Sequence, residues 1–208
     1  NVTAGQVYLT LLAKERKGEF LGGTIQAVPH VTNEIKAKVI ALADESQADV
    51  IVVEVGGTVG DIEGLPFLEA IRQIRNNVGR DNVFYVHLTL LPYLSAASEL
   101  KTKPTQHSVK ELRAIGIQPD AIICRSDHEV TDDIKTKISV HCDVPLQAVI
   151  TLPTVSTVYE VPLILEEEGL GDLVVETLGL TVQGQDLAEW RDLVAAMNRP
   201  KRVLPIAV

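Results

Sequence analysis

The sequence contains few cysteines and no long apolar run. Its two cysteines, Cys124 and Cys142, are too few for a disulfide-stabilised scaffold. Both lie in apolar stretches, which favours buried, reduced thiols in a cytoplasmic protein. No apolar stretch approaches the roughly 18 residues that a membrane-spanning helix needs. These absences argue against a disulfide-rich secreted domain, and no membrane partner is expected.

The sequence also lacks an excess of basic residues. Its 28 acidic residues outnumber 19 basic ones and give a formal net charge of -9. Nucleic-acid-binding domains are usually basic, so no nucleic-acid partner is expected. Residues 1–20 lack the pattern of a signal peptide, because a short apolar stretch runs into a charged cluster. They also lack an initial Met, so the chain is expected to be a fragment of a longer protein.

Four short apolar runs, most of them rich in β-branched residues, are predicted to be strands. They are nearly continuous rather than alternating, as expected of strands that are buried on both faces of a sheet. The runs are Asp49–Val55, Asn82–Leu91, Asp120–Cys124 and Ala148–Leu152. A chain of 208 residues fits one domain, or one domain plus a piece of another.

Helical patterns lie between and after these runs. The clearest start signal is a capping box formed by Ser108 and Glu111. The predicted helices are Thr32–Ser46, Leu65–Val78, Ser108–Ile115, Thr131–His141, Pro162–Glu168, Asp172–Leu178 and Asp186–Met197. Alternating strands and helices predict an α/β fold with a mostly parallel sheet flanked by helices, and ligands bind such folds beyond the carboxyl ends of the strands.

An acidic, glycine-rich segment follows the first predicted strand. Glu54 lies near the end of that strand, and the Gly56-Gly57 pair permits a tight turn before Asp61 and Glu63. A carboxylate inside a buried strand is costly unless it is paired or binds a metal ion, so Glu54 is a candidate ligand of Mg²⁺. A hydrogen bond from Glu54 to a neighbouring loop, with Asp61 only capping the next helix, is the alternative. The segment is not a Walker A loop, since no Gly-Lys-Ser/Thr follows it.

A basic segment, Leu100–Leu112, is the second candidate site. Two of its lysines, Lys101 and Lys103, precede the helix that is predicted to begin at Ser108. A helix N-terminus offers free N–H groups and a partial positive charge, and both suit phosphate. Pro104 stiffens the loop, which favours a preorganised site. The alternative is a solvated basic loop without a ligand.

The remaining histidine and serine patterns predict no site. The five histidines show no metal-ligand spacing, and no serine lies in a G-x-S-x-G motif. Neither a zinc site nor a Ser-His-Asp triad is expected.

Long stretches of the chain closely resemble CTP synthase, specifically its ATP-dependent amidoligase (synthetase) domain. The resemblance runs from about Gly5 to Leu180, and its longest gap-free motifs are GGTVGDIE and KTKPTQHSVKEL. Other matching stretches are GQVYLTLLAKERKGEFLGGTIQAVPHVTNEIK, VHLTLLPYL and VSTVYEVPLILEEEGL. The resemblance implies a P-loop NTPase-like, dethiobiotin-synthetase-like fold of the amidoligase type.

The resemblance also implies a reaction. In this family ATP phosphorylates the 4-oxygen of UTP, and ammonia then displaces the phosphate to give CTP, a step of pyrimidine nucleotide biosynthesis. The ammonia comes from glutamine, which a separate C-terminal glutaminase domain hydrolyses. The enzyme is a ligase that forms a C–N bond, with Mg²⁺ as cofactor, ATP as co-substrate and a cytoplasmic homotetramer as its assembly.

Site residues carry over where the motifs match. Glu54 would bind Mg²⁺. The residues implied to bind the triphosphate of UTP, or of the inhibitor CTP, are Lys101, Thr102, Lys103, Pro104, Thr105, Gln106 and Lys137. Those implied to contact CTP as inhibitor are Asp61, Ile62 and Glu63, and those near the adenine of ATP are Pro153, Thr154 and Val155.

The chain departs from the family at Leu152–Thr154, where a charged or polar pair is usual, so the adenine contact is less well defined.

Two further departures concern what the chain lacks. The family's N-terminal G-x-x-x-x-G-K-G loop is absent from the sequence, and so is the glutaminase domain, of which VLPIAV resembles only the first strand. We therefore expect a partial amidoligase domain over 1–180, a linker with a short helix over 181–202, and the first strand of a truncated glutaminase domain over 203–208. Such a chain is expected to be inactive alone, and no catalytic residue is assigned.

Two other functions stay open from the sequence. The first is a different P-loop-like Mg-ATP ligase, which would share the sheet but would not require the KTKPTQHS segment. The second is a non-catalytic assembly module that retains subunit contacts.

Overall fold

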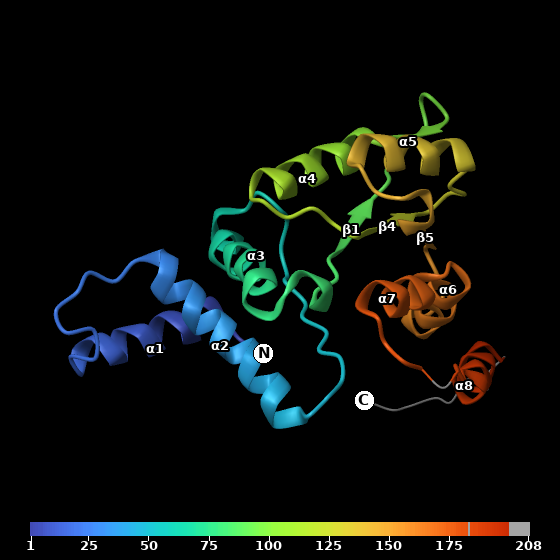
Figure 1. The fold of residues 1–208 in the computed structure, drawn as a ribbon. Helices are drawn as coiled ribbons and strands as arrows, with labels where there is room; N and C mark the ends of the chain where they lie inside the picture. The colour runs from blue at the N-terminus through green and yellow to red at the C-terminus, as the bar shows by residue number, and fades with distance from the viewer. Residues whose placement is uncertain (183, 200–208) are drawn as a thin grey trace, which may run out of the picture. The chain divides into compact units, whose positions relative to one another are not determined.

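The structure is a computed structural model that describes residues 1–182 and 184–199. The chain divides into two compact units. Figure 1 shows the helices and strands of both as a ribbon. The first comprises residues 1–85 and 107–118, and the second comprises residues 86–106 and the described residues from 119 onward. The predicted strand over 203–208 lies outside the described residues, and the predicted division into domain, linker and strand stays a prediction.

The second unit contains the parallel sheet. Its strands are β1 (Val86–Leu90), β4 (Ala121–Ser126) and β5 (Val149–Pro153), in the order β1-β4-β5 and all parallel. The central strand β4 is almost entirely buried, with Ile122 and Cys124 fully enclosed. Three of the four predicted strands and the parallel pairing are thereby confirmed.

Helices flank this sheet. Figure 1 shows α5 (Asp132–Cys142) on one side of it and α6 (Val161–Glu167) with α7 (Leu170–Leu178) on the other. The edge strand β5 turns one unpaired amide toward α6, where the N–H of Thr151 donates to the Glu168 carboxylate at 2.9 Å. A charged acceptor at this point satisfies a backbone donor that the sheet leaves open. The predicted α/β class is confirmed.

A further helix, α8 (Ala188–Asn198), lies within the segment that was predicted to be a linker with a short helix. Its Trp190 indole N–H donates to the backbone oxygen of Tyr159 at 2.8 Å, and the Asn198 amide donates to Glu160 at 2.8 Å. These contacts attach α8 to the residues that precede α6.

The first unit is built around α1 (Ala4–Arg16), α2 (Thr32–Ser46) and α3 (Leu65–Val78). Helix α1 was not predicted, although it begins with a capping box between Thr3 and Gln6 and buries Val7 and Leu11 four residues apart. Helices α2 and α3 have the predicted bounds. Thr32 is the first residue of α2, and it follows a short π-helical turn over Ala27–Val31.

The predicted strand over Asp49–Val55 is wrong. These residues form an extended segment without strand pairing, and the side chain of Val52 is 90% exposed. β-branched composition favours strand geometry, but a strand forms only where a neighbour accepts and donates its backbone hydrogen bonds. No described strand pairs with this segment.

The predicted start of the helix at Ser108 is also wrong. Helix α4 spans Lys103–Ala114, so Ser108 lies inside it and the capping box with Glu111 does not form. The backbone N–H of Gln106 already donates to the oxygen of Thr102 at 3.0 Å. Pro104 was interpreted as a loop residue, yet proline fits the first turn of a helix because the N–H that it lacks has no partner there.

Both cysteines are buried, as predicted. Cys124 and Cys142 are free thiols with no exposed surface, and burial raises the pKa of Cys124 to about 12. The Cys124 thiol therefore stays protonated at neutral pH. Among the helices that the structure describes, none combines the length and the apolar character that crossing a membrane requires.

Candidate functional site

The basic motif lies at the carboxyl end of β1. After Leu90 the chain forms a hairpin of two short antiparallel strands, β2 (Tyr93–Leu94) and β3 (Glu99–Leu100). The backbone N–H of Lys101 donates to the oxygen of Pro92 at 2.9 Å and closes the hairpin. The hairpin, which was not predicted, therefore returns the chain to the sheet edge where α/β folds bind ligands, and α4 begins there.

The two threonines of the motif point inward. Thr105 is fully buried, and its hydroxyl lies 2.9 Å from the hydroxyl of Thr89 on β1. Thr102 is also buried, and its hydroxyl accepts a hydrogen bond from the Gln106 amide at 3.1 Å. The Thr105 contact attaches the first turn of α4 to β1, and the bond from Gln106 to Thr102 closes that turn locally. Direct contacts of Thr102 and Thr105 with a nucleotide stay a prediction.

The lysines of the motif point outward. Lys103 is the first residue of α4 and is exposed, so its ammonium group stands at the positive end of the helix. Lys101, two residues earlier, keeps about a third of its side chain exposed. Because α4 begins at Lys103 and not at Ser108, both charges lie closer to the free N–H groups of the helix than the sequence predicted. A phosphate placed here would meet both kinds of donor.

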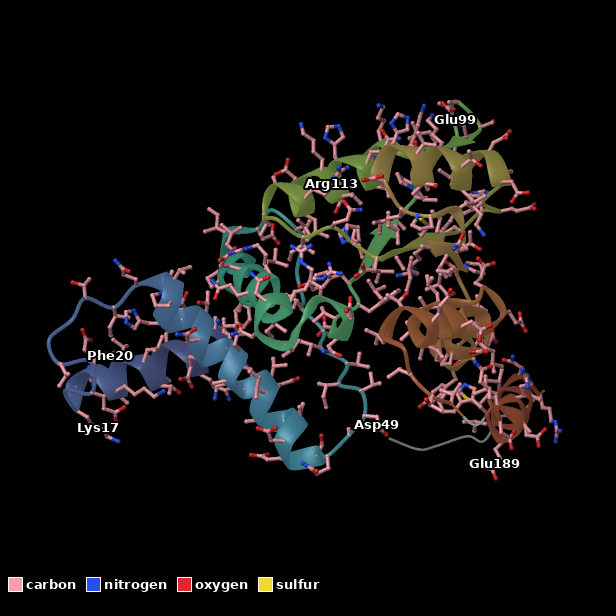
Figure 2. The ribbon with its side chains drawn as sticks, in the orientation of Figure 1. Lys17, Phe20, Asp49, Glu99, Arg113 and Glu189 are labelled. Atoms are coloured by element: carbon pink, nitrogen blue, oxygen red, sulfur yellow. The ribbon has the colours of Figure 1, made fainter. Side chains whose placement is uncertain are left out.

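The positive charge of Lys137, on α5, acts on Glu99, the residue that also pairs with Lys101. The carboxylate of Glu99 on β3 forms an ion pair with Lys101. The hydrogen bond from Lys101 lowers the pKa of Glu99, and the charges of Lys101 and Lys137 lower it further. Figure 2 shows Glu99 at the hairpin, next to α5. Lys101 is therefore paired with Glu99, and the charge of Lys137, which is distant in the sequence, acts on the same carboxylate.

The ends of β4 and β5 complete this edge of the sheet. The N–H of Thr154 donates to the backbone oxygen of Ser126 at 3.0 Å, and the Thr154 hydroxyl donates to the carboxylate of Asp127. The ring of His128 stacks on that of Tyr93 with their centres 3.7 Å apart. Three side chains that the sequence did not single out therefore link the ends of all three strands: Tyr93, Asp127 and His128. A search beyond the carboxyl end of the predicted strand Asp120–Cys124 would have found the last two.

The segment predicted to lie near adenine is at the same edge. Pro153 ends β5, Thr154 is exposed, and Val155 is partly buried. The Thr154 hydroxyl donates to Asp127 and its backbone N–H donates to Ser126, so both donors of this residue are already engaged at the edge of the sheet. The second unit thus contains residues 100–106 of the basic segment together with Lys137 and Pro153–Val155.

The acidic segment belongs to the first unit. Glu54 was predicted to lie inside a buried strand, but it is exposed, so no burial cost forces it to bind a metal ion. Gly57 adopts a φ of 94°, which favours glycine, and the carboxylate of Asp61 accepts the N–H of Thr58 at 3.0 Å. Asp61 therefore stabilises this turn and does not cap the short 3-10 helix Ile62–Gly64 that follows.

Both acidic side chains approach the Gly56-Gly57 turn. A Cβ atom added at Gly56 would lie 3.5 Å from Oε1 of Glu54, and one added at Gly57 would lie 3.7 Å from Oδ2 of Asp61. Within the described ranges, no three His, Cys, Asp or Glu residues gather into a group that could hold a metal ion. One or two carboxylates nevertheless fit Mg²⁺, which is commonly bound through a few carboxylates together with phosphates and water.

One of the histidines, His87, lies within the parallel sheet. His87 on β1 is buried, and its burial lowers its pKa, which keeps the ring neutral at neutral pH. Its position in the strand explains why an apolar run can contain a histidine.

Comparison with known proteins decides the family. The family described as "CTP synthase N-terminus" matches residues 1–180, most of the chain. The chain belongs to this family. The resemblance drawn from the motifs GGTVGDIE and KTKPTQHSVKEL is thereby confirmed, as is the α/β amidoligase type of fold.

Individual members of the family match along the entire chain. A CTP synthase of Herpetosiphon aurantiacus is 59% identical over 208 residues, which are 39% of its own length. A CTP synthase of Dehalococcoides mccartyi is 62% identical over 207 residues, or 38% of its length, and one of Chloroflexus aggregans is 61% identical over 208 residues, also 38% of its length. The chain thus spans about two fifths of the length of the curated relatives it matches.

Proposed function

We propose that this chain forms the nucleotide-binding part of an enzyme that converts UTP to CTP at the expense of ATP. The observation that carries the proposal is the position of Lys101 and Lys103 at the true N-terminus of α4, beyond the carboxyl end of β1. Membership of the CTP synthase N-terminus family supports it. Because the chain spans about two fifths of its relatives, the complete activity is proposed for the complete gene product.

The triphosphate is the group that the basic motif suits. A nucleoside triphosphate has several negative charges along one chain, and lysine ammonium groups bind such charges as flexible point charges. UTP and the product CTP share this group, so one set of residues serves the substrate and the inhibitor: Lys101, Thr102, Lys103, Pro104, Thr105, Gln106 and Lys137. Within this set, we assign Thr102 and Thr105 to holding the first turn of α4 and the lysines to binding phosphate oxygens.

The reaction places different demands on the other residues. A phosphoryl group passes from ATP to the 4-oxygen of UTP, and ammonia from glutamine then bonds to that ring carbon as phosphate leaves. Pro153, Thr154 and Val155 would lie along the adenine of ATP, and Asp61, Ile62 and Glu63 would contact CTP. Glu54 would help to hold Mg²⁺, which offsets charge on the ATP phosphates when it is bound. No residue of this chain is assigned to the chemical step itself.

The proposal extends to assembly and location. A cytoplasmic homotetramer is proposed, without a nucleic-acid or membrane partner. The chain alone is proposed to be inactive, with 1–180 as part of the amidoligase domain, 181–202 as a linker and 203–208 as the first strand of a glutaminase domain.

Product formation tests the proposed function. The complete gene product is supplied with ATP, UTP, Mg²⁺ and ammonia, and the nucleotides are separated by chromatography. We expect CTP and ADP in equal amounts, with no ADP when UTP is omitted. Absence of CTP would refute the proposal, and ADP formation that is independent of UTP would favour a different Mg-ATP ligase.

A further inference from the structure

Glu99 places a negative charge where a phosphate is proposed to bind. It is part of the two-residue strand β3, directly before the basic motif, and about half of its side chain is exposed. Its carboxylate accepts a hydrogen bond from the Lys101 ammonium group and lies in the field of Lys137. In the free chain, Lys101, which is proposed to bind triphosphate, is therefore already paired with an anion.

We propose that Glu99 is an internal competitor of the triphosphate, which holds Lys101 until a nucleotide displaces its carboxylate. The inference rests on the proposed function, since it takes Lys101 and Lys137 as triphosphate ligands. Displacement is favourable because a triphosphate offers these lysines several charges, whereas Glu99 offers one. The Glu99 side chain is free to turn into water once it is released, so its charge does not become buried.

The backbone of the hairpin does not need to move in this exchange. The bond from the N–H of Lys101 to the oxygen of Pro92 and the pairing of Tyr93 with Leu100 hold the main chain on both sides of Glu99. Only side-chain torsions have to change. If Glu99 instead oriented Lys101 in the bound complex, removing its charge would raise the KM for UTP rather than lower it.

The substitution Glu99→Gln in the complete gene product tests the inference. The variant keeps a polar side chain but removes the charge, so the KM for UTP is expected to fall about two- to fivefold, a range that suits an exposed ion pair. We expect kcat and the KM for ATP to stay unchanged. Inorganic tripolyphosphate should become a better competitive inhibitor against UTP by a similar factor, since it shares only the phosphate groups.

A matched control separates this effect from general charge. Glu189→Gln changes the net charge equally on the exposed surface of α8, away from the hairpin, and should leave the KM for UTP unchanged (Figure 2). An unchanged or higher KM in Glu99→Gln, or an equal fall in Glu189→Gln, would overturn the inference. If the wild-type protein forms no CTP, the proposed function fails separately, and calorimetric binding of tripolyphosphate to both variants still tests the displacement.

Discussion

Substituting Lys103 by alanine in the complete gene product is expected to lower kcat/KM for UTP by about ten- to a hundredfold. The side chain is exposed at the first position of α4, so its removal should leave the fold intact. The substitution removes a charged partner of the triphosphate, and a hydrogen bond to a charged group contributes about 1.5–3 kcal/mol. Each 1.4 kcal/mol corresponds to about a factor of ten. Steady-state kinetics at varied UTP, with ATP saturating, measures the effect.

Lys110→Ala supplies the control for this substitution. Lys110 lies two turns further along the same helix and is exposed, so the variant removes the same charge from the same element. Its kcat/KM for UTP should stay within about twofold of the wild-type value, since a surface substitution away from a site has a small effect. Equal losses in both variants, or no loss in Lys103→Ala, would rule out Lys103 as a triphosphate ligand.

The second large effect is expected at the buried threonine pair. Thr105→Val removes one hydroxyl of the pair while nearly keeping the shape of the side chain, and it deprives the Thr89 hydroxyl of a partner 2.9 Å away. Leaving a buried polar group without this bond should lower the free energy of unfolding by about 1–2 kcal/mol. The first turn of α4 loses its attachment to β1, so the KM for UTP should rise as well. Urea unfolding and UTP kinetics measure the two effects.

A double-mutant cycle isolates the contribution of the hydrogen bond. Thr89→Val combined with Thr105→Val removes both hydroxyls, so the double variant should lose less stability than the sum of the single losses. Thr105→Ser keeps the hydroxyl and should keep the KM for UTP near the wild-type value. Fully additive losses, or a normal KM for UTP in Thr105→Val, would contradict the role assigned to this pair.

Local sequence patterns predicted the helices and strands whose apolar spacing and boundary residues lie within the element itself. These are helices α2 and α3 and the strands β1, β4 and β5. The segment Asp49–Val55 failed for the opposite reason. Its composition favours a strand, but strand formation depends on a hydrogen-bonding neighbour, which composition cannot reveal.

The wrongly predicted start of α4 limited what could be predicted about the side chains of the basic segment. Once the helix begins at Lys103, the residues Thr105, Val109 and Leu112 fall on one face at helical spacing, and all three are buried. With the start placed at Ser108, the inward direction of Thr105 could not be derived. The lysines form a basic cluster that is visible in the sequence itself. The Glu99 ion pair and the stacking of Tyr93 on His128 instead arise from a hairpin whose strands have only two residues each, which the sequence pattern did not predict.

The roles given to Asp61, Ile62, Glu63 and Pro153–Val155 come from the resemblance alone, and the burial argument for Glu54 fails because its side chain is exposed. No pattern in the sequence distinguishes an exposed carboxylate that holds Mg²⁺ from one that only faces water. What the structure adds is that the carboxylates of Glu54 and Asp61 both approach the same glycine turn.

Lysine labelling with and without UTP is the most direct test of the central claim, that one triphosphate binds Lys101, Lys103 and Lys137 together. The complete gene product is acetylated briefly, and the modified peptides are quantified by mass spectrometry. UTP should slow the labelling of Lys101, Lys103 and Lys137 together and leave that of Lys110 unchanged. Equal labelling of the first three lysines with and without saturating UTP would contradict the account.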